Sequence, residues 1–351
     1  MTRRRLALIA QTFAAAATWL LFAATLLGRY ASHVSPERGG FWAVAALLLP
    51  VALLCDAVLL VGWLVCRRWR LAALPAAACV LCAGYLSALM QPPSLHAAKE
   101  RPRDLRIMTL NACGFLYPEP PGTTAPAIAR LAEREKVDVM FLQEAVPGSD
   151  FPKDSVAALF SGYFPYFVRD DLIALGSRYP IVKHHYLHFP NDQSTDYMWA
   201  DVVIGTDTIR FFSIHLKSTG ISDLRRKFRE EEKRRIPPRE VLNTLALNSR
   251  MRASQVETLR RIIDTTRYPV ILTGDFNDPP GTYTYRRLKG SLTDSFRAAG
   301  HGYGGTYRGL GGLMRIDYIF CDRHFEAVDL YMPSAIVSDH SAVIADLRFA
   351  R

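Results

Sequence analysis

The 351-residue sequence predicts an α+β domain of layered architecture, preceded by three apolar segments that are each long enough to cross a membrane. The first 90 residues are rich in Ala and Leu and carry few charges outside short clusters. From about Lys99 onward, short runs rich in Val, Ile and Phe alternate with helical patterns, which is typical of strands and helices in one layered fold. We therefore expect an anchor at residues 1–92, a linker at 93–103 and one domain at 104–351.

The apolar segments are Leu6–Leu27, Phe41–Cys66 and Leu71–Met90, and each holds 20 residues or more. Asp56 is the only charged residue within them. A helix of about 20 apolar residues spans a hydrocarbon core of about 30 Å, so each segment predicts a transmembrane helix. A buried helix and, for the first segment, a cleaved signal peptide are the alternatives. Three such segments in succession favour uncleaved spans.

Charges beside these segments predict their orientation. Arg3–Arg5 precede the first segment, and Arg67, Arg68 and Arg70 lie between the second and the third, whereas residues 29–40 hold two Arg and one Glu. Because cytoplasmic loops carry an excess of Lys and Arg, the domain at 104–351 is expected outside the cytoplasm. Four basic residues between 99 and 106 count against this orientation.

The six cysteines do not indicate a disulfide framework. Four of them lie in the predicted spans, which leaves Cys113 and Cys321 for the domain. These two could pair in an oxidising compartment, but both fall in predicted core strands, so free buried thiols are the favoured interpretation.

The predicted strands are short apolar runs that end in polar residues. A turn at 206–208 would join two of them, and helical patterns cover Ala125–Glu135 and Asn248–Thr265. The runs are Leu105–Leu110, Val137–Leu142, Trp199–Ile204, Ile209–Ile214, Val270–Thr273, Ile316–Cys321 and Ala342–Leu347.

Residues suited to metal-assisted phosphate chemistry follow the apolar runs at five strand ends. Side chains just past a buried strand are held rigidly at a sheet edge, which is where functional sites are built. Any one of them alone is more often a turn former. In chain order they are Asn111, Glu144, His215, Asp275 with Asn277, and Asp339 with His340.

This order resembles the DNase I-like (endonuclease/exonuclease/phosphatase) superfamily over the whole region from about Asp104 onward. The most specific pair of motifs is Gly-Asp-Phe-Asn at 274–277 with Ser-Asp-His at 338–340. Ser-Arg-Tyr-Pro-Ile at 177–181 and Arg-Ile-Asp-Tyr-Ile at 315–319 are supporting matches. The resemblance extends to a bacterial branch with three N-terminal spans. It implies a four-layer αββα sandwich and an inner-membrane protein with a periplasmic domain.

The resemblance also implies roles for these residues. Glu144, Asn111 and Asp339 would hold Mg²⁺ or Mn²⁺, whose preferred ligands are oxygens. His340 would deprotonate the attacking water, and Asp317 would fix the tautomer of that imidazole.

Further roles follow from the same resemblance. His215 and Asn277 would donate hydrogen bonds to phosphate oxygens, and Asp275 would orient the nucleophile or nearby donors. Arg178, in the Ser-Arg-Tyr-Pro-Ile match, and His301, in a Gly-rich loop, are candidates for substrate binding. Cys113 stands where some family members have an acidic ligand, which favours one metal ion over two.

Two further patterns are open to two interpretations each. His184, His185 and His188 lie close together, but without an evident acidic partner they predict surface side chains. Residues 224–252 hold ten Lys or Arg and four Glu around Pro237 and Pro238. This segment predicts either a solvated helix and loop or a basic flap that contacts phosphates of lipid or nucleic acid.

The expected function is hydrolysis of a phosphoester in a lipid or small molecule near the membrane. The alternative is an extracytoplasmic nuclease acting on DNA or RNA, and the net charge of +10 suits both. A scaffold that lost its chemistry is a third interpretation, but all the expected site residues are present. The expected partners are therefore the substrate and the bilayer, and nothing in the sequence requires a protein partner.

Overall fold

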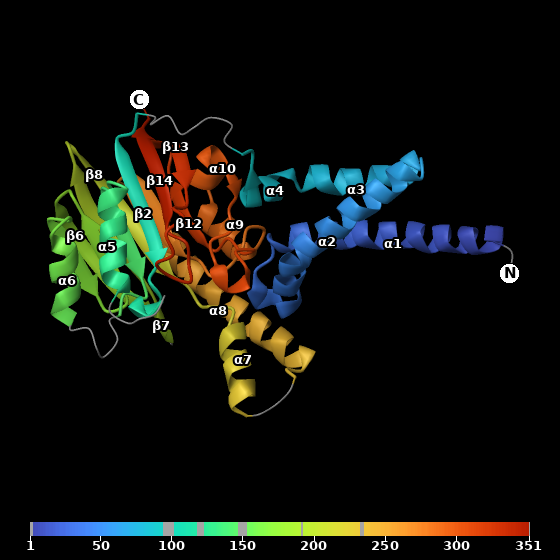
Figure 1. Cartoon of the computed structure of the whole chain (residues 1–351), viewed down its shortest axis with the longest axis horizontal. Coiled ribbons are helices and arrows are strands. Elements are labelled where there is room, and N and C mark those ends of the chain that lie inside the picture. The colour runs from blue at the N-terminus through green and yellow to red at the C-terminus, as the bar shows by residue number, and fades with distance from the viewer. Residues whose placement is uncertain are drawn as a thin grey trace. The chain divides into compact units, whose positions relative to one another are not determined.

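The computed structural model describes residues 3–93, 102–117, 123–146, 153–190, 192–231 and 235–350. Most of the predicted linker, residues 94–101, lies outside the described residues. The chain divides into two compact units (Figure 1). One comprises Met1–Ser87, Thr219–Ala253 and Gly281–Arg286, and the other comprises Ala88–Ser218, Ser254–Pro280 and Arg287–Arg351. The sequence did not predict that residues 219–253 and 281–286 group with the N-terminal helices.

The second unit contains two six-stranded sheets, each with parallel and antiparallel pairs (Figure 1). The order in one is β10-β12-β9-β8-β7-β6 and in the other β13-β14-β2-β3-β5-β4. The first sheet consists of β6 (Ile181–Phe189), β7 (Asp192–Ile204), β8 (Asp207–His215), β9 (Val270–Asp275), β10 (Thr293–Asp294) and β12 (Asp317–Cys321). The second consists of β2 (Leu105–Asn111), β3 (Val139–Gln143), β4 (Tyr166–Asp170), β5 (Ile173–Ser177), β13 (Phe325–Tyr331) and β14 (Val343–Phe349). A short pair joins β1 (Met90–Gln91) to β11 (Gly302–Tyr303).

The main core lies between the two sheets. Phe141 of β3 packs on Phe211 of β8, with ring centroids 5.9 Å apart. Successive side chains of a strand point to opposite faces, so Ile107 joins this core while Met108 joins a second core. Burial of both faces explains why these strands read as continuous apolar runs rather than as alternating ones.

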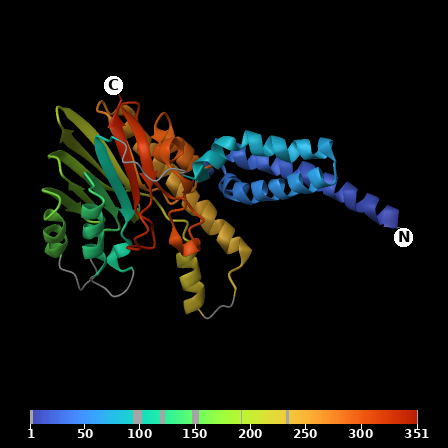
Figure 2. The same ribbon diagram turned by 45° about the horizontal axis from the view of Figure 1, so that its top comes forward.

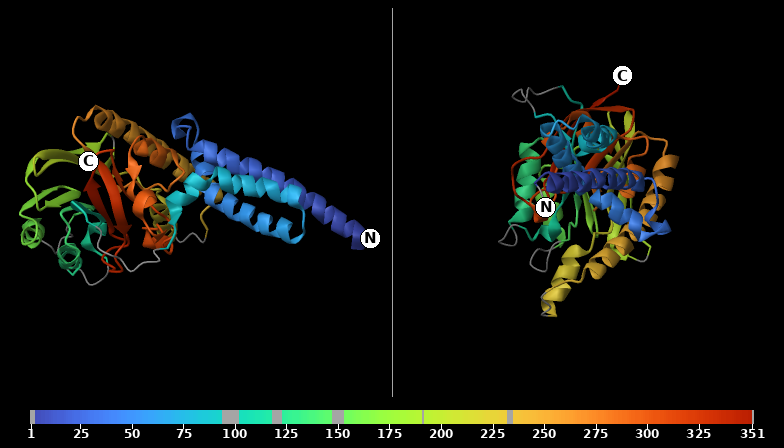
Figure 3. Two further views of the ribbon diagram at one scale, coloured as in Figure 1. Left: turned by 90° about the horizontal axis from the view of Figure 1, so that it is seen from above. Right: turned by 90° about the vertical axis from the view of Figure 1, so that its right-hand side faces the viewer.

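Helices cover the outer faces of the two sheets. The second core packs β2, β3 and β5 against α5 (Thr124–Arg134) and α6 (Lys153–Ser161). On the other side, the second part of α8 (Pro238–Thr265) meets β7, where Gln255 donates a 2.8 Å hydrogen bond to Thr195. Figure 3 shows α5 and α6 on one side of the paired sheets and this part of α8 on the other. Two short helices complete the fold, α9 (Tyr283–Lys289) and α10 (Ser295–Ala299).

The first unit contains α1 (Arg3–Ala31), α2 (Gly40–Val65), α3 (Trp69–Leu81), α4 (Ala83–Leu89) and α7 (Ile221–Glu230). The helices α1, α2 and α3 run side by side (Figure 2). Asp56 is fully buried between them and accepts a 2.6 Å hydrogen bond from Thr25 of α1, so it faces a neighbouring helix.

Two helical stretches, Gln11–Ala31 and Gly40–Val65, are long and apolar enough to cross a membrane. The third predicted span is not one straight helix. It consists of α3 and α4, which pass the same test only as a pair and are bent by 57°. The described residues therefore hold two candidate spans, or three if the bent pair counts as one, where the sequence predicted three.

The seven predicted apolar runs correspond to seven of the twelve strands of the two sheets, whereas β4, β5, β6, β10 and β13 were not predicted. The predicted helices are also present, but α8 begins ten residues earlier than expected, at Pro238. Within the basic segment, the described residues form a second helix, α7, and the first part of α8, which agrees with the helical part of the predicted solvated helix and loop. The cysteines of the second unit, Cys113 and Cys321, are free thiols as favoured from the sequence.

Gly274 precedes Asp275 at a point where β9 closely approaches β8. Its φ is +127°, and a Cβ there would lie 2.1 Å from the carbonyl oxygen of Ile214. We expect Gly274→Ala to lower the free energy of unfolding by roughly 2–4 kcal/mol, because two backbones would have to separate. Gly205→Ala is the matched control, since Gly205 also has a positive φ of +64° but meets nothing within 4 Å.

Thermal unfolding of the two variants in detergent measures the difference. We expect the control to cost only the left-handed strain, about 1 kcal/mol. Equal losses in the two variants would contradict the close-approach explanation.

Candidate active site

The site lies at the edge where parallel strands from both sheets end. Asn111 ends β2 beside Gln143 of β3, and His215 ends β8 beside Asp275 of β9. Carboxyl ends of parallel strands meet at one edge of a sheet. The antiparallel neighbour β12 begins at the same edge, because Asp317 pairs with Asp275. The strand pairing thus collects residues that are up to 206 positions apart in the sequence, from Asn111 to Asp317.

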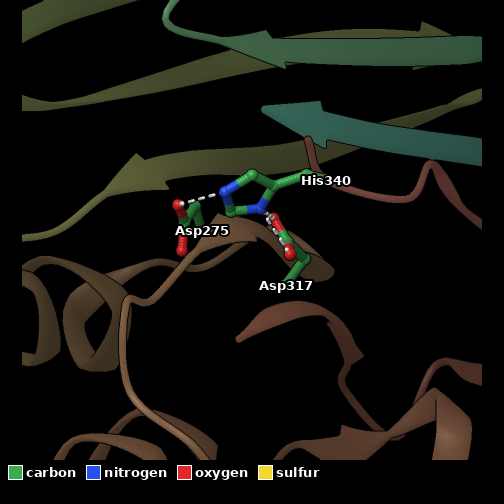
Figure 4. Close-up of side chains that lie close together, drawn as sticks. All are labelled: Asp275, Asp317 and His340. Atoms are coloured by element: carbon green, nitrogen blue, oxygen red, sulfur yellow. Dashed lines mark hydrogen bonds and ion pairs between the residues drawn. The ribbon is translucent and has the colours of Figure 1, made fainter. Parts of the chain in front are cut away.

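His340 is held between two aspartates, as Figure 4 shows. Its Nδ1 lies 2.9 Å from Asp317 Oδ2 and 3.1 Å from Oδ1, and its Nε2 lies 3.9 Å from Asp275 Oδ2. All three side chains are buried. A carboxylate only accepts hydrogen bonds, so Asp317 fixes the proton on Nδ1 and leaves Nε2 to act toward Asp275.

The loop before β12 fixes this pair. Thr306 Oγ1 accepts hydrogen bonds from the backbone N–H groups of Ile316 and Asp317, at 3.0 and 3.2 Å. The ring of Tyr307 packs on the His340 imidazole with centroids 5.1 Å apart. Both ends of the Asp317–His340 pair are therefore held by one segment of the Gly-rich loop.

The Asp275 carboxylate accepts three hydrogen bonds at this edge. Its Oδ1 accepts the backbone N–H of Asn277 at 2.8 Å, and its Oδ2 accepts amide hydrogens from Asn111 and Asn277 at 3.1 and 3.2 Å. The second amide hydrogen of Asn277 goes to the Leu216 carbonyl. In this arrangement Asn277 orients Asp275, and its expected hydrogen bond to a phosphate oxygen stays a prediction.

Glu144 is held by Asn111 and His215. Its Oε1 accepts a 2.8 Å hydrogen bond from the Asn111 amide and lies 3.3 Å from His215 Nε2. Both contacts use the same oxygen of a carboxylate whose side chain is 41% exposed. The other oxygen, Oε2, therefore remains available for a ligand on the exposed side.

The electrostatics of the site follow from burial and close pairing. Burial would raise the pKa of Glu144, but His215 and Asn111 outweigh it and lower that pKa to about 2. Burial opposes charge on the imidazoles, yet the carboxylates outweigh it. They raise the pKa of His215 to about 9 and that of His340 to about 10. Burial and the nearby Asp317 raise the pKa of Asp275 to about 6.

Backbone strain is present at two residues of the site. Glu144 and Asn277 have φ values of +49° and +51°, which non-Gly residues rarely adopt. Such conformations cost about 1–3 kcal/mol each and persist only where the surroundings impose them. Glu144 directly follows β3 and Asn277 lies two residues after the end of β9, so these backbone conformations direct their side chains into the hydrogen-bonded group just described.

The donor set suits a hard divalent cation. Five carboxylates, listed at the end of this paragraph, face two imidazoles, so added positive charge would be stabilised here. Burial and the neighbouring Asp339 and Glu144 raise the pKa of Cys113 to about 12, which keeps it a thiol and disfavours soft thiolate-bound metals. Asp275, Asp317 and His340 also have potential ligand atoms within 4.8 Å of one another. The carboxylates are Glu144, Asp196, Asp275, Asp317 and Asp339.

Two predicted substrate-binding residues lie away from this group. Arg178 follows Ser177, which pairs with Val139 at the start of β3, and its guanidinium lies 3.6 Å from Asp138. That is the opposite end of the strand from Glu144. His301 is exposed and lies 3.4 Å from Asp329, which pairs with Asp346 near the start of β2. The structure therefore does not bring Arg178 or His301 to the site edge, and we withdraw both from the candidate site.

Asp196 is a site residue that sequence reasoning missed. This buried residue of β7 pairs with His215, and its Oδ1 lies 3.8 Å from His215 Nδ1. Its Oδ2 accepts a 2.8 Å hydrogen bond from Tyr186. Asp196 lies inside a strand rather than after one, so a search for polar residues at strand ends passes over it. Asp196 follows five polar residues, Asn191 to Thr195, so the sequence around it carries no clear signal.

Arg308 was missed as well. Its backbone N–H donates a 2.8 Å hydrogen bond to the Asp339 carbonyl, and it follows Tyr307, whose ring packs on His340. Its Nε is buried and has no hydrogen-bond partner among the described residues. Arg308 is thus a cation beside the site whose guanidinium is not saturated by the protein.

The surface histidines have acidic partners that were not evident from the sequence. His184 lies 3.3 Å from Asp170, and His188 lies 3.1 Å from Asp171. Asp170 is the last residue of β4, and Asp171 lies in the turn after it. These partners belong to the second sheet, whereas the histidines lie in β6 of the first. The predicted surface location is confirmed for His184 and His185, which are exposed, and His188 is half-buried.

Comparison with known proteins agrees with this geometry. Residues 108–340 match the family model of the Endonuclease/Exonuclease/phosphatase family, and residues 11–89 match a domain of unknown function, DUF8431. No curated protein sequence matches the chain.

Solved structures show the same fold. An endonuclease/exonuclease/phosphatase from Beutenbergia cavernae is 23% identical with a TM-score of 0.51, over 71% of this chain and 72% of that one. A conserved protein of unknown function from Enterococcus faecalis is 15% identical with a TM-score of 0.51, over 70% of this chain and 100% of that one. A mannosyl-6-phosphatase of Bacteroides thetaiotaomicron is 19% identical with a TM-score of 0.48, over 70% and 100%.

The match at 108–340 covers about two thirds of the chain and includes Asn111, Glu144, His215, Asp275 and His340. Members of this superfamily are phosphoester hydrolases. The chain belongs to the Endonuclease/Exonuclease/phosphatase family.

Proposed function

We propose that this chain is a membrane-anchored, Mg²⁺- or Mn²⁺-dependent phosphoester hydrolase that acts on a lipid or small-molecule phosphate near the bilayer. The observation that carries the proposal is the buried Asp317–His340–Asp275 group, which lies at the same strand edge as Glu144, Asn111 and His215. The apolar stretches Gln11–Ala31 and Gly40–Val65 support the anchor. The Arg clusters favour an extracytoplasmic domain.

In this proposal, His340 is the general base that activates the attacking water. Its Nδ1 is occupied by Asp317, so Nε2 is the atom that takes a proton from the attacking water. A general base works best with a pKa near the working pH, whereas the surrounding carboxylates hold this one at about 10. A bound Mg²⁺ or Mn²⁺ would supply positive charge that neutralises phosphate oxygens and opposes the charge on His340.

Glu144, Asn111 and Asp339 are the residues that would hold this cation. Glu144 offers an unused carboxylate oxygen, and its low pKa of about 2 keeps it ionised. His215, with a pKa of about 9, is a charged donor for a phosphate oxygen. Arg308 replaces Arg178 as the proposed substrate-binding cation, because its Nε is unsatisfied and its neighbour contacts His340.

The main test uses the full-length protein in detergent with Mg²⁺ and bis-p-nitrophenyl phosphate. We expect His340→Ala to lower the rate at least about 10²-fold, the range for loss of a general base. His301→Ala is the control, because it removes an exposed imidazole away from the site. Activity should disappear with excess EDTA and return with Mg²⁺ or Mn²⁺. Equal rates for wild type and His340→Ala, or full activity in EDTA, would overturn the mechanism.

The substrate class is tested with the same protein on mixed phospholipid vesicles and on plasmid DNA. Release of a phosphorylated headgroup or of phosphate from lipid supports the proposal. Nicked plasmid together with intact lipid would identify the nuclease alternative instead.

Arg308 and Arg178 form a matched pair of variants. We expect Arg308→Ala to raise KM about tenfold or more through loss of a charged hydrogen bond to phosphate, while Arg178→Ala leaves KM unchanged. Steady-state kinetics on bis-p-nitrophenyl phosphate measure both. An effect confined to Arg178→Ala would restore the original sequence prediction.

Asp196→Asn tests the missed residue. Because Asp196 supports the charged form of His215, we expect kcat to fall about 10-fold to 100-fold with little change in thermal stability. Tyr186→Phe keeps the carboxylate and removes only one hydrogen bond to it, so its effect on kcat should be smaller. The ¹⁵N chemical shifts of His215 report its protonation directly. Unchanged shifts and kcat in Asp196→Asn would show that this contact has no functional role.

A further inference from the structure

The third apolar segment ends inside the unit that holds the candidate site. Its residues up to Ser87 belong to the first unit, whereas Ala88, Leu89 and Met90 belong to the second. Ala88 is only 1% exposed. We call residues 88–91 the junction segment, and this segment is part of the domain that follows it.

Backbone hydrogen bonds attach the junction segment to one end of the Gly-rich loop, residues 302–316. In the β1–β11 pair, Gln91 lies opposite Gly302. The backbone N–H of Gly304 donates a 2.9 Å hydrogen bond to the Leu89 carbonyl. Leu89 is the last residue of α4, where carbonyls have no partner within the helix. The loop thus binds a backbone acceptor that the helix leaves open.

Arg315, at the other end of the loop, binds the same segment. Its Nη1 donates a 2.9 Å hydrogen bond to the Ala88 carbonyl. The guanidinium also donates to both oxygens of Asp294, at 2.8 and 2.5 Å, and lies 4.5 Å from the centroid of the Phe296 ring. Because Asp294 already balances the charge of this buried cation, the bond to Ala88 fixes the position of the junction segment rather than neutralising a charge.

Both attachment points lie two residues from groups that hold the Asp317 backbone and side chain. Gly304 is two residues before Thr306, whose Oγ1 accepts the backbone N–H of Asp317 at 3.2 Å. Arg315 is two residues before Asp317 itself. The Asp317 carboxylate in turn lies 2.9 Å from Nδ1 of His340. A shift of the junction segment would therefore move both ends of the loop that orients the proposed base.

We propose that the junction segment and Arg315 position the Asp317–His340 pair, so that the end of the third apolar segment contributes to the site and does not only tether it. This inference rests on the role of His340 in the proposed function. Arg315 is a positioning residue, because it acts on His340 only through the loop and Asp317. A displacement of about 1 Å at a catalytic group can lower a rate about 10²-fold. Loosening the junction segment should therefore lower kcat. KM should change little, because Arg308 is held separately by the Asp339 carbonyl.

Arg315→Lys and Arg106→Lys form a matched pair of variants in the full-length protein. Arg106 is bound in the same manner, by two hydrogen bonds to Asp346 and one to the Glu135 carbonyl, but it lies at the opposite end of β2 from Asn111. Lysine keeps the charge and loses the two-pronged bonding in both. We expect both variants to lose thermal stability. Only Arg315→Lys should lower kcat on bis-p-nitrophenyl phosphate, about tenfold to 100-fold, with KM within about twofold.

Gln91→Pro and Gln91→Ala test the junction segment without altering the buried arginine. Proline removes the backbone N–H of the residue paired with Gly302, whereas alanine keeps it, so only Gln91→Pro should lower kcat. Hydrogen–deuterium exchange gives a readout that does not depend on activity. We expect the amides of residues 302–317 to exchange about tenfold faster than in wild type in Gln91→Pro and Arg315→Lys, and at the wild-type rate in Gln91→Ala and Arg106→Lys.

Each result decides the proposal. Lower kcat and faster loop exchange in Arg315→Lys and Gln91→Pro, with neither change in the controls, support it. Wild-type kcat or wild-type loop exchange in Gln91→Pro overturns it, and this pair decides alone if Arg315→Lys does not fold. An equal fall in kcat in Arg106→Lys also overturns it, because general destabilisation would then explain the loss. A wild-type rate no higher than that of His340→Ala refutes the proposed function itself, and it is recognised without any junction variant. Loop exchange in Gln91→Pro then decides whether the junction segment orders the Asp317 backbone.

Discussion

The parallel pairing of β2 with β3 and of β8 with β9 is the constraint on which the site depends. Each pair ends at the same edge of its sheet, and the two sheets face each other across a common apolar core. Gly274 lets β9 approach β8 closely enough for Asp275 to reach both Asn111 and His340. The chemistry thus rests on backbone geometry that apolar packing holds in place.

At these strand ends, each of the two buried imidazoles lies between two carboxylates. His340 is enclosed by Asp317 and Asp275, and His215 lies between Glu144 and Asp196. Burial makes each unpaired charge costly, so removal of one partner affects the others. The strained backbone at Glu144 fits this arrangement, because the site imposes a conformation that the residue alone would not adopt.

The two units support different parts of the proposal. The second unit holds the candidate site, whereas the first contains the apolar helices. In the proposed function, a hydrolase held at a bilayer by these helices would meet phosphoesters at the surface at a high local concentration.

The sequence by itself determined seven of the twelve sheet strands, the two long apolar helices and the order of the site residues, because burial on both faces produces apolar runs and motifs are local. The Asp317–His340 partnership was implied by the family resemblance. Only the tertiary structure decided which distant residues join. It added Asp196 and Arg308, excluded Arg178 and His301, and gave Asn277 an orienting role, since strand register and loop packing are set by contacts between distant segments. The bend in the third apolar segment was also decided there, because hydropathy reports length and composition but not where a helix breaks.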